Sequence, residues 1–187
     1  SIRGASEVAG GGIGNRVLLL LDGRPAITPE SGGALWNLVP LAAIERIEVI
    51  KGAYSSLYGS SAMGGIVNVI TRTPDTASHS DLNLHYGAYG PAPAYTGYKR
   101  YNDFFGAEFI TSRKLNKWSY LFNFAGKSND GNREQSSFNL YNGYGKFKFD
   151  FSPNRSLQIS AMYNDIFNDT PATWLSTTEA YSVADYR

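Results

Sequence analysis

Three stretches of the sequence bring together residue types that could do chemistry, and the first two lack an essential member. Gly59, Ser61 and Met63 follow the spacing of a turn that presents a nucleophilic serine, but methionine stands where the second glycine is required. The glycine-rich run 10–14 precedes an aliphatic run instead of following one, and Val17 takes the place of the third glycine of a dinucleotide-binding loop. A serine hydrolase and a nucleotide-binding fold are therefore not indicated.

The third stretch contains the only two histidines, His79 and His85. On one strand, residues six positions apart face the same side but are separated by about 20 Å, too far to ligate one metal ion. Either histidine could ligate a haem singly, although a surface or lumen histidine is the commoner case. The chain has no cysteine, which excludes disulfides and cysteine-ligated metal sites. We therefore expect no catalytic residues, no metal site and no cofactor, and we predict that the protein is not an enzyme.

Charge and composition limit which partners and which structural class we expect. The chain has 17 basic and 16 acidic residues, and its formal net charge of +1 is too small to attract nucleic acid. We therefore do not expect nucleic acid as a partner. The longest aliphatic run, Val17–Leu21, is far shorter than the roughly 20 residues of a membrane-spanning helix. Aromatic residues make up 14% of the chain and charged residues only 18%, which indicates β-structure.

Up to about Pro74 the sequence mixes short aliphatic runs with glycines and predicts a compact α/β unit. Its predicted elements, in chain order, are a strand at 17–21, a tight turn at Asp22-Gly23, a helical turn at 40–44, a strand at 47–50, a helical turn at 54–58 and a strand at 66–70. Gly52, Gly59, Gly64 and Gly65 are spaced as backbone pivots, which would let a short helix fold tightly between two strands.

Past Pro74 apolar and polar residues alternate at period two, which places one set on each face of a strand. The five alternating runs cover 82–86, 105–109, 119–124, 141–151 and 157–164. Short turns at 115–117 and 152–155 alternate with long polar connections at 87–101, 127–136 and after Asn168. This is the layout of an outer-membrane β-barrel, with its turns in the periplasm and its loops outside the cell.

A soluble antiparallel sandwich shows the same alternation and stays open as an alternative. The aromatic residues favour the membrane, because Trp118, Tyr120, Tyr141 and Tyr163 fall near strand ends, as aromatic girdles do at lipid interfaces. Five strands cannot close a barrel, and open edges in lipid leave backbone groups unpaired. We therefore expect these strands to be part of a larger barrel.

A set of linked motifs in the first part of the chain resembles a known family. The motifs are Leu21-Asp22-Gly23-Arg24-Pro25, Val39-Pro40, the run 44–52 and the run 55–71. In order and spacing they resemble the plug domain of TonB-dependent outer-membrane transporters, and Ser1-Ile2-Arg3-Gly4 resembles a strand near the middle of that plug. The matching signature positions are Arg3, Gly4, Asp22, Gly23, Glu45, Arg46, Glu48, Gly52, Tyr58, Gly59, Gly64, Gly65 and Asn68.

The resemblance implies an α+β plug domain followed by antiparallel transmembrane β-barrel strands, as in a plugged barrel of about 22 strands. Residues 1–76 would be the later two-thirds of the plug, and residues 77–187 would supply about the first five barrel strands. Arg3 and Arg46 match plug arginines that pair with glutamates on the inner barrel wall. Alternatively, Glu45, Arg46 and Glu48 simply lie on a solvated strand edge.

In the family, the apical loops of the plug and the upper inner wall of the barrel bind the ligand. By position, the apical loops would be 6–15 and 24–37. The substrate-binding candidates on these loops are Glu7, Asn15, Thr28, Glu30 and Trp36, and the aromatic candidates from the barrel are Tyr89, Tyr95, Tyr98, Phe167 and Trp174. The alternative for each aromatic residue is that it only stiffens its loop.

The function implied is energy-coupled import through the outer membrane of a Gram-negative bacterium. A TonB-type protein would pull on a segment upstream of Ser1 that pairs with it as an added strand. Outer-membrane lipid and a small-molecule ligand are the other expected partners. We expect a ferric siderophore or another metal chelate, although haem, cobalamin, nickel complexes and oligosaccharides enter through similar plugs. The alternative is a non-transport outer-membrane barrel, or a soluble β-rich domain for ligand binding or adhesion.

Overall fold

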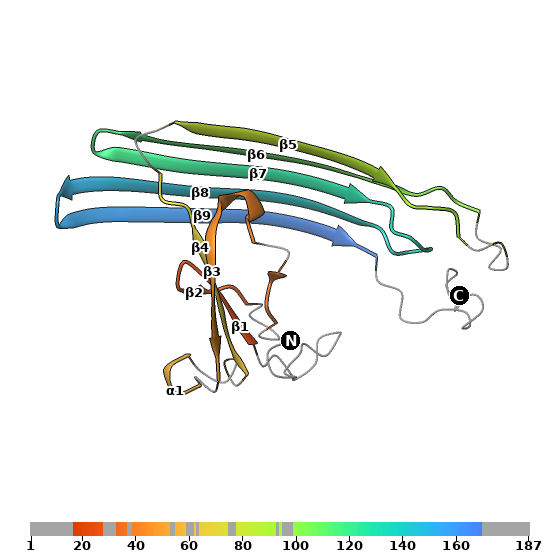
Figure 1. Cartoon of the computed structure of the whole chain (residues 1–187), viewed down its shortest axis with the longest axis horizontal. Helices are drawn as coiled ribbons and strands as arrows, with labels where there is room; N and C mark the ends of the chain where they lie inside the picture. The colour runs from red at the N-terminus through yellow and green to blue at the C-terminus, as the bar shows by residue number, and fades with distance from the viewer. Residues whose placement is uncertain are drawn as a thin grey trace. The chain divides into compact units, whose positions relative to one another are not determined.

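The computed structural model describes residues 17–27, 33–36, 39–52, 55–58, 62, 64–74, 78–92, 94 and 99–169. The chain divides into two compact units, residues 1–74 and 75–187. The first unit contains a small mixed sheet, and the second contains an antiparallel sheet of five strands (Figure 1). Among the residues described, no helix is long and apolar enough to cross a membrane.

The first unit contains a four-stranded sheet with the strand order β2-β1-β4-β3. Its elements are β1 (Val17–Leu21), β2 (Arg24–Pro25), the 3-10 helix η2 (Leu41–Ala43), β3 (Ile44–Lys51), α1 (Ser55–Tyr58) and β4 (Gly65–Thr71). Strands β1 and β4 are parallel, whereas the β1–β2 and β3–β4 pairs are antiparallel. All three strands predicted from the aliphatic runs therefore form, and β3 begins three residues earlier than predicted.

The core of this unit lies on the central strands. Leu18, Leu20, Ala62 and Ile66 pack into one buried cluster. Strand β1 is buried from its second residue to its last, which explains why it is a continuous aliphatic run instead of an alternating one. The predicted turn after it is a two-residue hairpin, since Asp22 and Gly23 both have positive φ, at 48° and 77°. The predicted helical turn near Pro40 is the 3-10 helix, with Pro40 just before its first residue.

The second unit is an antiparallel sheet in which neighbours in sequence are neighbours in space, in the order β5-β6-β7-β8-β9. The strands are β5 (His79–Ala88), β6 (Asp103–Leu115), β7 (Trp118–Asn129), β8 (Phe138–Ser152) and β9 (Arg155–Asn168). Each contains one of the five predicted alternating runs and extends beyond it. Strand β5 has 10 residues and β8 has 15, which meets or exceeds the length needed to cross a bilayer.

The connections of the sheet differ at its two ends. Residues 116–117 and 153–154 form tight turns, and Asn116 adopts the left-handed conformation with φ 55°. At the other end, 14 residues separate β5 from β6 and eight separate β7 from β8. The order of short and long connections follows the prediction, so one end of the sheet carries only turns and the other carries the long loops.

The two faces of the second sheet have opposite character. The register places Leu84 beside Ala107, Phe109 beside Phe124 and Phe147 beside Ile159, so that aromatic and aliphatic side chains cover one face, the apolar face. The opposite face is the polar face. It carries the buried side chains of Ser119, Asn123 and Lys146. Many large side chains of the apolar face are exposed instead: Leu82, Leu84, Tyr86, Phe105, Phe124, Tyr141, Ile159 and Tyr163. This is the inverse of the distribution in the core of a water-soluble protein.

Candidate functional site

A chain of polar contacts joins the first hairpin to the last strand of the small sheet. The carboxylate of Asp22 accepts two hydrogen bonds from Thr71, one from the backbone N–H and one from the hydroxyl, each at 2.8 Å. Thr71 is buried, so Asp22 supplies the partners of two groups that water cannot reach. The positive φ of Asp22 places the hairpin next to the end of β4, where the backbone N–H of Asp22 also donates to the carbonyl of Val69 at 2.9 Å.

Asn68 continues the network toward β3. Its Oδ1 accepts from the backbone N–H of Gly23 at 3.1 Å, and its Nδ2 donates to Glu48 Oε2 at 3.3 Å. Asn68 is able to reach both because β4 lies between β1 and β3, and Glu48 is its direct partner in the β3–β4 register. One amide therefore couples the hairpin on one side of β4 to the edge strand on the other.

Arg46 ends the network on the edge strand β3. Its guanidinium makes ion pairs with Glu48 at 2.9 Å and with Glu45 at 3.3 Å, and all three side chains are substantially exposed. These contacts match the arrangement expected for charges on a solvated strand edge. The pairing of Arg46 with a glutamate of a barrel wall stays a prediction, as does that of Arg3, which is outside the described residues.

Besides Gly23, two more of the signature glycines occupy positions where backbone geometry favours glycine. Gly52 after β3 has φ 133°, and Gly65 at the start of β4 has φ 145°, which other residues rarely adopt. They flank the segment that contains α1, so the chain reverses between the antiparallel strands β3 and β4 as predicted. Gly64 precedes β4 directly, and Tyr58 is the last residue of α1. Gly4 and Gly59 lie outside the described residues.

Tyr89 is one of the five aromatic candidates from the barrel, which together would line a vestibule for the ligand. It lies at the base of the loop between β5 and β6, where its side chain has two partners. Its hydroxyl donates to Asn129 Oδ1 at 3.0 Å, and its ring packs edge-on against Phe104, with ring centroids 5.6 Å apart. Phe104 and Asn129 are direct register partners on β6 and β7. These contacts give Tyr89 a stiffening role and also hold its ring over the face of the sheet that Phe104 and Asn129 share.

The base of the β5–β6 loop is bonded to the start of the β7–β8 loop by residues that were not predicted from the sequence. The backbone N–H of Gly131 donates to Asn129 Oδ1 at 2.7 Å, and Asn102 Nδ2 donates to the carbonyl of Gly131 at 2.7 Å. Gly131 has φ 77°, and Asn129-Asp130-Gly131 is a sequence typical of a turn with a left-handed residue. That signal could have located the turn, although not its contact with Asn102.

The other vestibule candidates are not brought together with Tyr89 in the part of the chain that the structure describes. Phe167 lies on β9 opposite Asn139, and the alternation of the strand places it on the same face as Tyr163, the apolar face. Phe167 therefore gives the vestibule no support. Trp36 is a candidate of the loop 24–37 and not of the vestibule. It follows the isolated bridge between Ile27 and Ala34 and is exposed. The candidates outside the described residues are Glu7, Asn15, Thr28, Glu30, Tyr95, Tyr98 and Trp174.

The polar face of the second sheet carries its own paired groups. Glu108 accepts a hydrogen bond from Asn123 Nδ2 at 3.2 Å. Nearer the short turns, Asp150 makes ion pairs with Lys148 at 2.9 Å and with Lys114 at 3.6 Å. Within the described ranges, no group of three or more His, Cys, Asp or Glu side chains is placed to hold a metal ion. A polar face opposite an aromatic one is the pattern of a transmembrane β-strand, whose two faces meet the lumen and lipid.

Comparison with known proteins identifies the first unit. Residues 1–66 match the family model described as the TonB-dependent Receptor Plug Domain. The first part of the chain is thus a TonB-dependent receptor plug domain. The match covers Arg46 and Glu48 of the polar network, and Asn68 and Thr71 lie on β4 of the same sheet. The matching proteins place the chain in the outer membrane of a Gram-negative bacterium.

Curated relatives of this chain have names that differ from one another. The chain is 43% identical over 74 residues to the vitamin B12 transporter BtuB of Vibrio vulnificus, an alignment that covers 40% of this chain and 12% of BtuB. It is 50% identical over 66 residues to the iron-regulated outer membrane virulence protein of Vibrio cholerae, covering 31% of this chain and 10% of that protein. The chain thus spans about a tenth of the length of these curated relatives.

Solved structures show that the likeness extends to the strands. The siderophore receptor PirA of Pseudomonas aeruginosa superposes with a TM-score of 0.65 at 23% identity, over 82% of this chain and 26% of PirA. The pyoverdine receptor FpvA of the same species, bound to pyoverdine, superposes with a TM-score of 0.62 at 21% identity, over 80% of this chain and 20% of FpvA. At these identities the superpositions establish the fold, a plug domain followed by antiparallel barrel strands.

Proposed function

We propose that the protein is an outer-membrane receptor that imports a scarce ligand by TonB-dependent, energy-coupled transport, and that the ligand is a ferric siderophore or another metal chelate. One observation carries the proposal: a single chain joins a plug sheet, with its signature residues in one polar network, to a sheet whose exposed face is aromatic. A soluble β-rich domain explains neither the plug sheet nor the exposed aromatic face.

The metal-chelate ligand is supported by the names of similar proteins. By their titles, one of the structural neighbours is a siderophore receptor and another is a pyoverdine receptor. A Pseudomonas aeruginosa relative that is 36% identical over 78 residues is a ferric enterobactin receptor. That alignment covers 36% of this chain and 10% of the relative. Cobalamin is the second candidate because the vitamin B12 transporters match at 40% to 43% identity. Cobalamin is itself a metal chelate, so the two candidates differ in size and periphery more than in class.

We propose the following division of labour within the chain. Residues 1–76 form the later part of the plug, and residues 77–187 supply the first strands of the barrel wall. Arg3 and Arg46 anchor the plug through glutamates of the wall, and a TonB-type protein pulls on a segment that precedes Ser1. The ligand contacts the loops 6–15 and 24–37 together with Tyr89, Tyr95, Tyr98 and Trp174. Tyr89 is the best supported of these, since its ring is already fixed at a loop base.

The experiment that tests the function uses the full-length protein in its source organism. The gene is deleted, and uptake of radioactive iron as ferric siderophores and of labelled cyanocobalamin is measured in iron-starved cells. We expect uptake of one ferric siderophore to fall to background and to return with the wild-type gene, while cobalamin uptake is unchanged. Loss of cobalamin uptake alone would reassign the ligand. Unchanged uptake of both ligands in the deletion strain, together with absence of the protein from the outer-membrane fraction of wild-type cells, would overturn the proposed transport function.

A further inference from the structure

The two long loops of the second sheet are bonded to each other where they leave the strands. The β5–β6 loop covers residues 89–102, and the β7–β8 loop covers residues 130–137. Both ends of the β5–β6 loop contact one short turn, residues 129–131, at the beginning of the β7–β8 loop. This turn, the clamp turn, lies where the pairing of β6 with β7 ends.

Four residues at this place form a closed circuit of hydrogen bonds. The Tyr89 hydroxyl donates to Asn129 Oδ1 at 3.0 Å, and the backbone N–H of Gly131 donates to the same oxygen at 2.7 Å. The carbonyl of Gly131 accepts from Asn102 Nδ2 at 2.7 Å. The carbonyl of Asn102 then accepts from the backbone N–H of Tyr89 at 2.9 Å, which closes the circuit. Tyr89 begins the β5–β6 loop and Asn102 ends it, so the clamp turn holds both ends of that loop.

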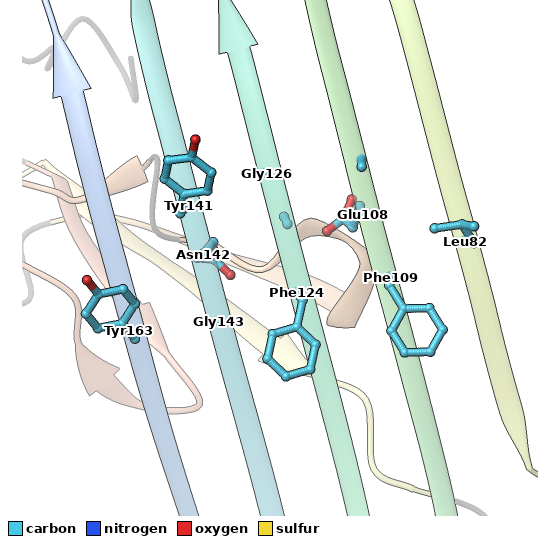
Figure 2. A pocket seen from close by; sticks show the side chains of 11 residues that line it. Leu82, Glu108, Phe109, Phe124, Gly126, Tyr141, Asn142, Gly143 and Tyr163 are labelled. Atoms are coloured by element: carbon cyan, nitrogen blue, oxygen red, sulfur yellow. The ribbon is translucent and has the colours of Figure 1, made fainter.

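The strands below the clamp turn bring the members of this circuit to one place. Asn129, the last residue of β7, is the register partner of Phe104 on β6. Figure 2 shows the same two strands nearer their middle, where the rings of Phe109 on β6 and Phe124 on β7 lie side by side. The ladder of backbone hydrogen bonds thus fixes where each loop starts, and the circuit beyond the ladder fixes how the loop leaves the sheet.

The conformation of the clamp turn is imposed by the β7–β8 loop. Gly131 has φ 77°, in the left-handed region that favours glycine. A Cβ atom at Gly131 would collide with the hydroxyl and the backbone carbonyl of Ser136. The Ser136 hydroxyl is itself held, because it accepts from the backbone N–H of Arg133 at 3.2 Å and donates to the carbonyl of Arg133 at 2.7 Å. The β7–β8 loop is therefore closed on itself and supports the clamp turn independently of the β5–β6 loop.

We propose that Asn129 and Gly131 are positioning residues for the base of the β5–β6 loop, so that this base and the β7–β8 loop move as one unit. Asn129 fixes the phenol of Tyr89, and Gly131 fixes the buried amide of Asn102, which would lose free energy without its partner. Long loops of outer-membrane barrels are extracellular, which places the clamp turn on the side from which a ligand arrives.

A displacement of the clamp turn would displace the ring of Tyr89, and would therefore change the affinity for a ligand that the turn itself does not touch. This step rests on the proposed function, in which Tyr89 contacts the ligand. The coupling between the two loops does not rest on it, because every bond of the circuit lies within the chain. The two statements therefore need separate measurements.

The first test changes one loop and measures the other. Gly131→Ala strains the clamp turn, and amide hydrogen exchange at Tyr89 is measured in the full-length protein without ligand. We expect the Tyr89 amide to exchange about tenfold faster, which corresponds to about 1.4 kcal/mol. The matched control is Ser137→Ala, which removes the hydrogen bond from the Ser137 hydroxyl to Asp169 at 2.6 Å, at the same end of the sheet and outside the circuit. It should leave exchange at Tyr89 unchanged. Faster exchange confined to residues 130–137 would show that the loops are not coupled and would overturn the proposal.

The second test separates positioning from packing. Both bonds to the Asn129 side chain use Oδ1 as the acceptor, so Asn129→Asp retains them and Asn129→Ala removes them. Each full-length variant replaces the wild type in its source organism, and uptake of radioactive iron supplied as ferric enterobactin is measured. We expect Asn129→Ala to raise the half-saturation concentration about fivefold at an unchanged maximal rate, and Asn129→Asp to behave as the wild type does.

Other outcomes of the uptake measurement contradict the positioning role. A lower maximal rate with an unchanged half-saturation concentration would mean that Asn129→Ala only reduces the amount of folded protein. An equal rise in Asn129→Ala and Asn129→Asp would show that the bonds to Oδ1 are not the cause. If the wild type takes up no ferric enterobactin, that failure concerns the proposed ligand, and exchange of the Tyr89 amide in the same two variants decides on the clamp turn. Faster exchange in Asn129→Ala alone supports the coupling, and no difference between the variants overturns it.

Discussion

The two sheets of this chain place apolar side chains in opposite ways. In the plug sheet, Leu18, Leu19 and Ile66 are buried and the charged residues of β3 lie at an exposed edge. In the barrel sheet, Leu84 and Phe124 are exposed and Lys146 is buried. Burial of apolar surface drives the first arrangement, since the surroundings are polar. An exposed apolar face, as in the barrel sheet, is stable only where the surroundings are themselves apolar. The contrast therefore indicates that this face of the barrel sheet contacts lipid.

The largest expected effect tests the buried side of the contrast. Leu18→Ala removes a side chain from the plug core and leaves a cavity, so it should lower the local free energy of unfolding by about 3 kcal/mol. The measurement is amide hydrogen exchange in the full-length protein, in β1 and β4 for Leu18→Ala and in β5 and β6 for the control. Leu84→Ala on the apolar face is the matched control and should cost about 1 kcal/mol, because lipid fills the space and no cavity forms. Equal effects of the two substitutions would contradict the contrast.

The second prediction tests the lipid-facing side. Phe124→Arg places a charge on the apolar face and should destabilise the folded barrel by about 2–4 kcal/mol in a bilayer, as arginine does at the lipid face of such barrels. The measurement is urea unfolding of the full-length protein in phospholipid vesicles. Phe124→Leu keeps the site apolar and serves as the control. If Phe124→Arg were as stable as Phe124→Leu, the apolar face would not be in lipid.

The third prediction concerns the polar network of the plug. Asp22→Ala leaves the N–H and the hydroxyl of the buried Thr71 without their carboxylate partner, and should cost about 2 kcal/mol of plug stability. Asp22→Asn retains one carbonyl acceptor and tolerates the left-handed backbone, so it should lose about half as much. Hydrogen exchange at the Thr71 amide measures both. Faster exchange at β1 with no change at Thr71 would show that the two residues are not coupled.

The smallest expected effect distinguishes the two interpretations of Arg46. As one member of an exposed ion-pair cluster, Arg46→Ala should change plug stability by less than about 0.5 kcal/mol, and added salt should reduce even that. If Arg46 instead pairs with a buried glutamate of the barrel wall, the loss should reach about 3 kcal/mol. Hydrogen exchange in β3 of the full-length protein, with Lys51→Ala as a control on the same strand, separates the two results.

Most of the secondary structure was predictable from the sequence, because the signals are local. Alternation at period two identified all five barrel strands, and the continuous run of β1 identified a strand inside a sheet. The face of β9 on which Phe167 lies was also predictable, because Phe167 is four residues after Tyr163 in the same alternation. Its assignment to the vestibule did not take this alternation into account. Strand ends were less accurate, because a strand continues for as long as its neighbour offers backbone partners.

The sequence by itself determined the family signature, the strand periodicity and the turn glycines Gly23, Gly52 and Gly65, because each depends on residues close together along the chain. Only the tertiary structure decided which distant residues meet. Asp22 and Thr71 are 49 positions apart, and Asn68 and Glu48 are 20 apart. They touch because β4 inserts between β1 and β3, and Gly126 lies beside Tyr141 because β7 and β8 pair in one register. Backbone hydrogen bonding between strands fixes that order and register, and no local pattern encodes it.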